Sequence, residues 1–206
     1  MKLTNCKVEN CNKKSIFFTD YCFFHSENKE KVIEDSRKFI QENNDLKGYN
    51  FSYLPLDKID FSGKDISYSF FSHCSLKECK FKNTTIISAF FDFANLSKCD
   101  FTQAVIQYGV FGGADLSNSF FYDSNVNFSN FLGAGLKESN FNNSDIRYSR
   151  FINSITENTV FFNCNLKKTF FQNITFDERS LKSSNPQDAT IINCECKDCD
   201  IKEYML

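Results

Sequence analysis

The chain has 206 residues, among them 26 Phe, no Trp, 7 Gly and 2 Pro, and a formal net charge of −2. Phe is about one residue in eight, roughly three times its usual share, and the scarcity of Gly and Pro argues against a disordered or collagen-like chain. The small net charge indicates no strong field for nucleic acid or membranes. No apolar run approaches the ~20 residues that span a bilayer, and the first residues lack the apolar stretch of a signal peptide. We therefore expect a cytoplasmic protein without membrane contact.

Residues 1–27 hold four candidate metal ligands, Cys6, Cys11, Cys22 and His25, at the spacing C-x4-C-x10-C-x2-H. Two short ligand pairs joined by a loop suit a tetrahedral Zn²⁺. A short segment with few apolar residues also needs a bound metal or a similar cross-link to stabilise its fold. The alternative is three free thiols and a surface histidine. The segment is similar to short Cys3His zinc ribbons, and four protein ligands would make the Zn²⁺ structural. Residues 1–48 hold 9 basic and 8 acidic residues, so direct nucleic-acid binding is only weakly indicated.

Residues 28–48 are expected to form a helix and a linker. Val32, Ile33, Phe39 and Ile40 make one apolar stripe at helical spacing. The helix would cover the front end of the structure that follows.

A period of five begins at Tyr49 and runs to about residue 176. The third residue of each block alternates between Phe and an aliphatic residue, as in Phe51, Leu56 and Phe61. The exception is Thr156, where we expect the neighbouring Ile155 to turn inward. The first residue of each block is small from Ser69 through Thr169. Neither a helix nor a strand produces this spacing, whereas a chain that turns a corner every five residues does, with the first and third side chains inward.

The blocks Ala114-Asp115-Leu116, Ala94-Asn95-Leu96, Cys99-Asp100-Phe101, Ser144-Asp145-Ile146 and Cys164-Asn165-Leu166 carry a resemblance to the pentapeptide-repeat family. The resemblance implies an all-β fold, a right-handed quadrilateral β-helix with four blocks to a coil. It covers residues 49–176, which would form a rod of about six coils. Residues 177–188 break the pattern and are expected to be a loop. The repeats resume in residues 189–206, which would close the far end or pair with a second copy in a homodimer.

Most cysteines of the repeat are expected to pack as small core residues. Cys74, Cys79, Cys99, Cys164, Cys194 and Cys199 stand at the small inward position, and Cys196 at the large one. A redox or metal role remains the alternative for Cys194, Cys196 and Cys199.

Residues twenty apart should stack on one face of the rod. Two outward columns then flank one corner and carry Tyr68, Phe70, Phe90, Tyr108, Val110, Phe128 and Tyr148. This stripe is a candidate partner-binding surface, and the alternative is that its rings only stabilise neighbouring coils. His73 is expected to be an ordinary surface histidine, because no nucleophile stands at motif spacing.

We find no active site in the sequence and expect a non-enzymatic protein. The leading hypothesis is a rigid rod that presents a surface to an unidentified protein partner. The family resemblance implies an alternative, a DNA mimic that binds a type II topoisomerase (gyrase) and protects it from quinolones. The mixed charge and the absence of an inserted loop weaken that alternative. Nucleic-acid binding through the zinc module is a further hypothesis.

Overall fold

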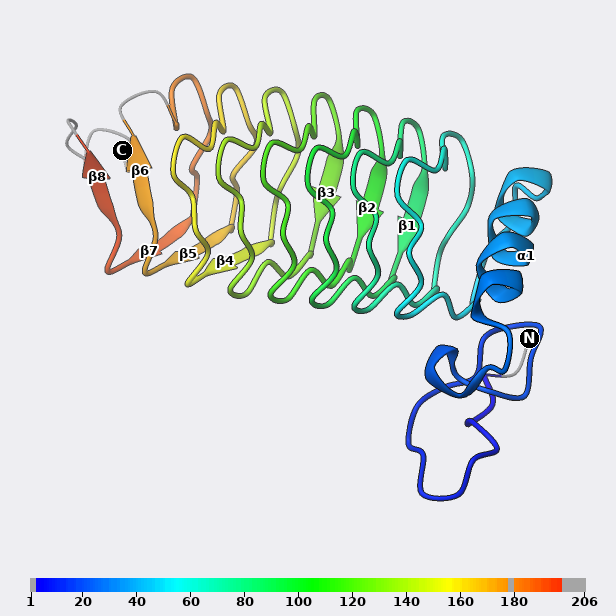
Figure 1. Ribbon diagram of the computed structural model, residues 1–206. Helices are drawn as coiled ribbons and strands as arrows, with labels where there is room; N and C mark the ends of the chain where they lie inside the picture. The colour runs from blue at the N-terminus through cyan, green and yellow to red at the C-terminus, as the bar shows by residue number, and fades with distance from the viewer. Residues whose placement is uncertain (1–2, 178–179, 198–206) are drawn as a thin grey trace.

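The computed structural model describes residues 3–177 and 180–197. It contains a 3-10 turn η1 (Phe23–His25), a helix α1 (Lys29–Glu42) and the short strands β1 (Thr85–Ile87), β2 (Val105–Gln107), β3 (Asn125–Asn127), β4 (Arg150–Ile152), β5 (Phe170–Gln172), β6 (Thr175–Asp177), β7 (Thr190–Ile192) and β8 (Glu195–Lys197). Figure 1 shows successive coils stacked into a rod, with α1 across one end and the N-terminal segment beside it.

Each coil pairs with the coil twenty residues later, always in parallel. β1, β2 and β3 form one sheet, β4, β5 and β7 a second, and β6 and β8 a third. Single bridges continue the same register, as between Asp45 and Asp65 or between Asn165 and Asn185. The rod has four faces, which we name by an early inward residue: the Phe51, Leu56, Phe61 and Ile66 faces. The predicted quadrilateral β-helix is thus confirmed.

Two ladders of phenylalanine fill the interior. One runs from Phe51 to Phe171 and the other from Phe61 to Phe161, in steps of twenty residues, with ring centroids 4.4 to 5.3 Å apart within each ladder. This distance is close to the spacing between adjacent strands, so one ring fits each coil. Rings of the two ladders meet edge to face, as Phe81 and Phe91 do. Both geometries are favourable for aromatic pairs.

The small inward residues are buried and many are hydrogen-bonded. Cys74 Sγ donates to the carbonyl of Phe51 at 2.8 Å, and Ser119 Oγ donates to that of Leu96 at 2.8 Å. In each case the acceptor lies 23 residues earlier, in the preceding coil. A larger side chain would push the two coils apart, which is the reason for the small residues.

The rod begins one block earlier than predicted, at Leu46. Leu46 is fully buried, and its N–H donates to the carbonyl of Asp65 at 2.7 Å. In this first coil the position that is small elsewhere is large, because no coil lies beneath it. Its four occupants face the end cap instead: Tyr49, Leu54, Ile59 and Lys64. The Lys64 ammonium donates to the carbonyl of Asn43 at 2.8 Å.

The loop predicted for residues 177–188 is wrong for the part of it that the structure describes. Leu181 is 3% exposed, and residues 180–187 accept hydrogen bonds from the preceding coil, as between Phe161 N–H and Ser180 O at 2.8 Å. Leu181 and Pro186 keep the five-residue register, so the coil continues although Ser183, Ser184 and Asn185 disguise the pattern. Residues 178–179, and 198–206 of the predicted end segment, lie outside the described residues.

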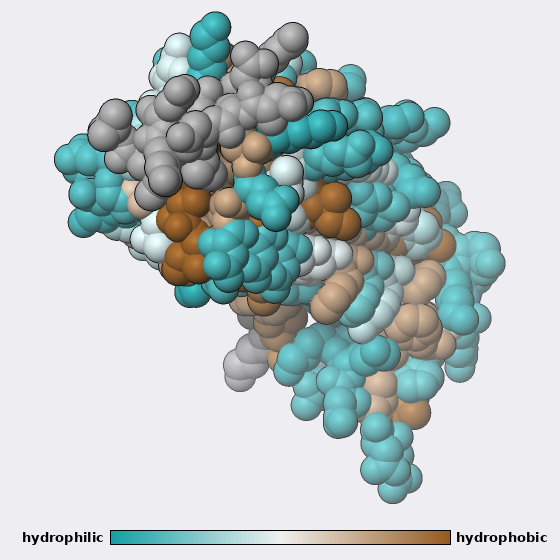
Figure 2. Space-filling model, turned by 90° about the vertical axis from the view of Figure 1, so that its left-hand side faces the viewer, coloured by the Kyte–Doolittle hydropathy of each residue, from teal (hydrophilic) through white to brown (hydrophobic). Residues whose placement is uncertain are grey.

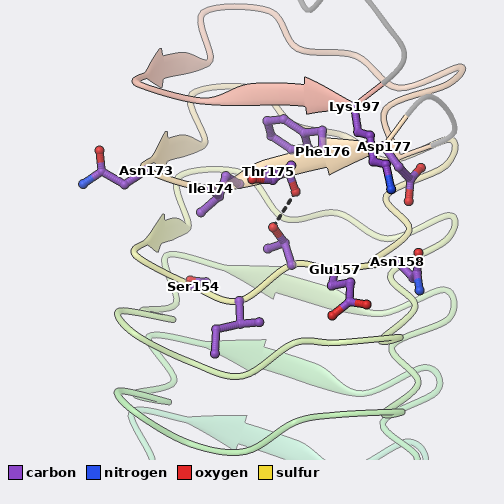
Figure 3. Close-up of a pocket in the computed structure, with 11 residues that line it drawn as sticks. Ser154, Glu157, Asn158, Asn173, Ile174, Thr175, Phe176, Asp177 and Lys197 are labelled. Carbon is purple, nitrogen blue, oxygen red and sulfur yellow. Dashed lines mark hydrogen bonds between the residues drawn. The ribbon is translucent and has the colours of Figure 1, made fainter.

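The ladder on the Leu56 face has a gap near the far end. No backbone hydrogen bond joins 154–158 to 173–177 among the described residues; instead Thr156 Oγ1 donates to Thr175 O at 2.6 Å (Figure 3). The expected slip of Ile155 is wrong: Ile155 is 61% exposed and Thr156 is buried. Ile174, at the small position, is 3% exposed. A branched side chain there holds the coils apart, and the short Thr156 beneath leaves room for it.

Helix α1 covers the first coil as predicted. Val32 and Ile40 are buried, and Ile33 and Phe39 are partly buried against the same core. None of the helices in residues 3–177 and 180–197 is long and apolar enough to cross a membrane. Figure 2 shows the end of the rod near β6 and β8, where hydrophilic side chains surround small apolar patches.

Candidate metal centre and aromatic surface

The structure brings the four predicted metal ligands together. Their ligand atoms all lie within 4.8 Å of one another. Cys6 Sγ is 3.3 Å and Cys22 Sγ is 3.5 Å from His25 Nδ1, and the sulfurs of Cys11 and Cys22 are 3.9 Å apart. A tetrahedral Zn²⁺ with ordinary bond lengths would set sulfur–sulfur edges of ~3.8 Å and sulfur–nitrogen edges of ~3.6 Å. The donor set and its spacing therefore fit Zn²⁺.

Two local structures place these ligands. The strand-like pairing of Asn5 with Lys14 and a tight turn bring Cys11 back toward Cys6; Asn10 in that turn has a φ of 61°, which Asn tolerates better than most residues. The single turn of η1 returns His25 to Cys22, whose carbonyl accepts the His25 N–H at 3.0 Å. The C-x2-H spacing in the sequence encodes this turn.

The surroundings of Cys6 favour a thiolate. Burial raises the pKa of Cys6, but the N–H groups of Cys22 and Val8 and the His25 ring outweigh it and lower the pKa to about 6. Burial raises the pKa of Cys22, and the neighbouring sulfurs of Cys6 and Cys11 add to that rise. A bound cation would relieve this crowding of sulfurs, because it stabilises each thiolate.

The loop between Cys11 and Cys22 seals the end of the rod. The ring of Phe17 lies 5.2 Å from that of Phe51, the first ring of the inner ladder, and 4.4 Å from that of Phe39. Ile16 is 1% exposed. The buried Asn50 amide donates to the carbonyl of Ser15 at 2.8 Å. The cysteine-rich segment and α1 together therefore form the cap, a role that the sequence assigned to the helix.

Most rings of the predicted aromatic stripe stack along one corner of the rod. Tyr108, Phe128 and Tyr148 form a column with centroid distances of 5.0 and 4.6 Å, and the Lys168 ammonium lies 5.6 Å from the Tyr148 ring. These three side chains and Tyr68 are 40–55% exposed. The other predicted members, Phe70, Phe90 and Val110, are half-buried, and the rings of Phe70 and Phe90 stack at 4.9 Å. The rings of Tyr108, Phe128 and Tyr148 are thus both stacked on one another and exposed to solvent.

A second column of rings escaped the sequence analysis. Tyr53, His73 and Phe93 stack with centroid distances of 4.8 and 5.2 Å, and Phe24 of the N-terminal segment meets Tyr53 at 4.8 Å. His73 is therefore part of an aromatic column and not an isolated surface residue. The twenty-residue spacing of these three positions was the signal that could have found the column.

The buried cysteines of the repeat have thiols that resist deprotonation. Burial raises the pKa of Cys164 to about 12, and it raises those of Cys74 and Cys99 as well. Cys194 is partly buried against the core. Cys196 is also partly buried against the core, as expected, and it is disulfide-bonded in addition. Cys199 lies outside the described residues.

A cavity of about 380 Å³ lies at the ladder gap on the Leu56 face (Figure 3). Its lining includes Thr156, Glu157, Ile174, Asp177 and Lys197. The described lining thus mixes apolar side chains with side chains of both charges. The cavity is a consequence of the gap between the coils.

Residues 71–103 and 88–121 match the sequence model of pentapeptide repeats, described as eight copies. This match falls within the coils whose five-residue register is described above. Residues 71–121 therefore carry pentapeptide repeats. The resemblance noted in the sequence is thereby confirmed for residues 71–121.

The structure is similar to solved structures of pentapeptide-repeat proteins. They include HetL, involved in heterocyst differentiation regulation, from the cyanobacterium Nostoc sp. strain PCC 7120 (13% identity, TM-score 0.38, 76% of this chain and 93% of HetL). A trypsin-treated variant of QnrB1, a plasmid-mediated fluoroquinolone resistance protein, matches at 14% identity and a TM-score of 0.36, over 78% of this chain and 84% of QnrB1. Rfr23 from the cyanobacterium Cyanothece 51142 matches at 13% identity and a TM-score of 0.25, over 80% of this chain and 96% of Rfr23. No curated protein matches the sequence.

Proposed function

We propose that this pentapeptide-repeat protein is a non-enzymatic interaction module that holds a partner protein against the aromatic stripe. The observation that carries the proposal is the exposed, stacked column of Tyr108, Phe128 and Tyr148 on a rigid rod. Aromatic residues are enriched at the centres of protein interfaces, and rings already held by stacking lose little conformational freedom on binding. Tyr68, Phe70, Phe90 and Val110 extend the same surface.

A pull-down from an extract of the source cells tests this proposal. Tyr108→Asp and Phe128→Asp place a charge in the column without touching the core, so partner capture should fall while the circular dichroism stays unchanged. Lys98→Asp, an exposed change on the Leu56 face, is the matched control. Equal capture by all three variants would contradict the proposal.

We also propose that Cys6, Cys11, Cys22 and His25 hold a structural Zn²⁺, which the fit of their spacing to a tetrahedron supports. With four protein ligands the ion would have no open position for catalysis. Elemental analysis should find about one Zn²⁺ per chain, and Cys22→Ser or His25→Ala should lose it. His73→Ala, which changes the other histidine, should keep it. Freshly purified, reduced protein without metal would overturn this assignment.

The topoisomerase-binding alternative rests on the family resemblance and remains a second proposal. A gyrase supercoiling assay with ciprofloxacin, with and without the protein, tests it directly. No protection at micromolar protein would exclude it, and so would equal protection by an unrelated protein.

Gel filtration of the same sample would show whether the chain forms the expected homodimer. Cytoplasmic location is likewise a proposal, which fractionation of source cells would test.

Nucleic-acid binding through the N-terminal segment is the third candidate. It predicts binding that weakens with salt and disappears in Cys22→Ser. The nearly balanced charge of that segment makes it the least supported of the three.

A further inference from the structure

A half-buried carboxylate lies on the Phe51 face between two pairs of aromatic rings. Asp92 follows Phe91, which points inward, so Asp92 and Phe90 both point outward from the same side of the coil. Phe90 stacks on Phe70 on one side of Asp92. Phe93, the next residue, stacks on His73 on the other side. Asp92 therefore stands between the ring-bearing positions 90 and 93 along the chain.

The Asp92 carboxylate reaches over the next coil because that coil carries glycine. Gly112 occupies the position twenty residues later, and a Cβ there would lie 3.2 Å from Asp92 Oδ1. Gly113 follows, and a Cβ there would lie 2.7 Å from the Phe93 ring. Side chains at these two positions would crowd the carboxylate and the ring. With glycine in both positions, the Asp92 carboxylate and the Phe93 ring lie against the backbone of Gly112 and Gly113.

Asp92 has no Lys or Arg within ion-pair distance in the part of the chain that the structure describes. Burial raises the pKa of its carboxyl, while its own N–H, Ser72 and His73 oppose that rise. A carboxylate that is partly removed from water and lacks a counter-ion gains from an external cation. Phe93, at 64%, is also the most exposed of the large apolar side chains described.

We propose that this place on the Phe51 face binds an arginine side chain of the partner protein, with Asp92 as its counter-ion. A guanidinium suits it because its two edges can pair with a carboxylate while its plane lies against aromatic rings. Phe70 and Phe90 also belong to the aromatic stripe, so the arginine would anchor one end of the same interface. The inference rests on the proposed interaction role of the rod.

The test is an NMR titration of the zinc-loaded full chain with N-acetyl-arginine-N-methylamide. The neutral probe is the citrulline analogue, which has the same shape but no charge. Arginine should move the amide signals of Asp92, Phe93, Gly112 and Gly113, and citrulline should leave them in place. Asp92→Asn should weaken arginine binding about tenfold or more, as expected for the loss of a charged hydrogen bond.

Asp115→Asn is the matched control, because Asp115 is a half-buried carboxylate on the neighbouring face without flanking rings. It should bind arginine as the parent protein does. Equal shifts with citrulline, or unchanged affinity in Asp92→Asn, would overturn the inference. The pull-down with Tyr108→Asp and Phe128→Asp is independent of these results. Loss of capture there without arginine binding at Asp92 would refute only the inference, and the reverse outcome would refute only the proposed stripe.

Discussion

At the scale of single residues, the position within the five-residue block decides what a side chain does. Phe101 and Cys99 are two residues apart and both fully buried, yet one fills the axis and the other donates from Sγ to the Leu76 carbonyl at 3.0 Å. Phe93 and Phe128, outside the axis, are exposed. The same residue type is thus core or surface according to its register alone.

Removing one axial ring should cost far more than removing a surface side chain. Phe101→Ala removes a ring stacked at 4.6 Å on Phe81 and at 4.7 Å on Phe121, and we expect it to lower the free energy of unfolding by about 3–5 kcal/mol. Leu132→Ala, at a 47% exposed position, should change it by less than about 1 kcal/mol. Urea denaturation followed by circular dichroism gives both values, and similar values for the two variants would contradict the assigned register.

The buried repeat thiols should resist alkylation in the native protein. Burial raises the pKa of Cys74, Cys99 and Cys164, so at pH 8 these groups stay protonated and lack the thiolate that iodoacetamide attacks. Mass spectrometry should find them unlabelled until guanidinium chloride is added. Rapid labelling of Cys164 in the folded chain would show that its coil opens.

At the scale of elements, the end cap is assembled from two segments that depend on each other. α1 supplies Phe39 and the cysteine-rich segment supplies Phe17, and the two rings meet over the start of the Phe51 ladder. Arg37 adds a hydrogen bond from its guanidinium to the carbonyl of Pro55 at 2.9 Å. An uncovered end would leave unpaired backbone and apolar rings in water.

Removal of the metal should therefore loosen the front of the rod. The proposed Zn²⁺ holds the ends of the loop that carries Phe17, so chelation should speed amide hydrogen exchange in residues 13–17 and at Phe51 and Tyr53. Phe17→Ala should reproduce the faster exchange at Phe51 while Zn²⁺ stays bound. Exchange near Phe131, far along the rod, serves as the internal control. Unchanged protection at Phe51 after zinc loss would show that α1 covers the end by itself.

At the scale of the whole molecule, the described residues pair from coil to coil along the Phe51 and Ile66 faces, whereas the pairing is interrupted on the Leu56 face. Thr156 is a short residue at a position that normally holds a large axial side chain. Ile174 is a branched residue at a position that normally holds a small one. Both line the cavity at the ladder gap (Figure 3). The gap thus arises from two residues, with no insertion in the repeat.

Exchanging the two residues should close the gap. Thr156→Leu alone should overpack the site and Ile174→Ala alone should leave a void, and we expect each to destabilise the protein by about 1–3 kcal/mol. The double variant restores the ordinary pair, so a double-mutant cycle should show a favourable coupling of at least ~1 kcal/mol. Additive effects would mean that the two side chains do not share one space.

Much of this architecture was predictable because a regular repeat places each residue in an environment set by its register. The Phe axis, the small corner residues and the helix stripe all followed from spacing, as did the metal cluster from its two ligand pairs. The start at Leu46 was missed because residues 44–48 fall in the stretch interpreted as the helix and its linker. The coil in 180–187 was missed because turn-type residues hid Leu181 and Pro186.

By itself the sequence determined the repeat, its inward and outward positions and the residue types of the candidate metal site, because these depend on spacing along the chain. Only the tertiary structure decided which distant residues meet: Phe17 over Phe51, Tyr53 beside His73, and Asp92 beneath Gly112. The physical reason is that these contacts depend on how the ends are covered and on which side chains are absent above a given position. Neither property has a period in the sequence.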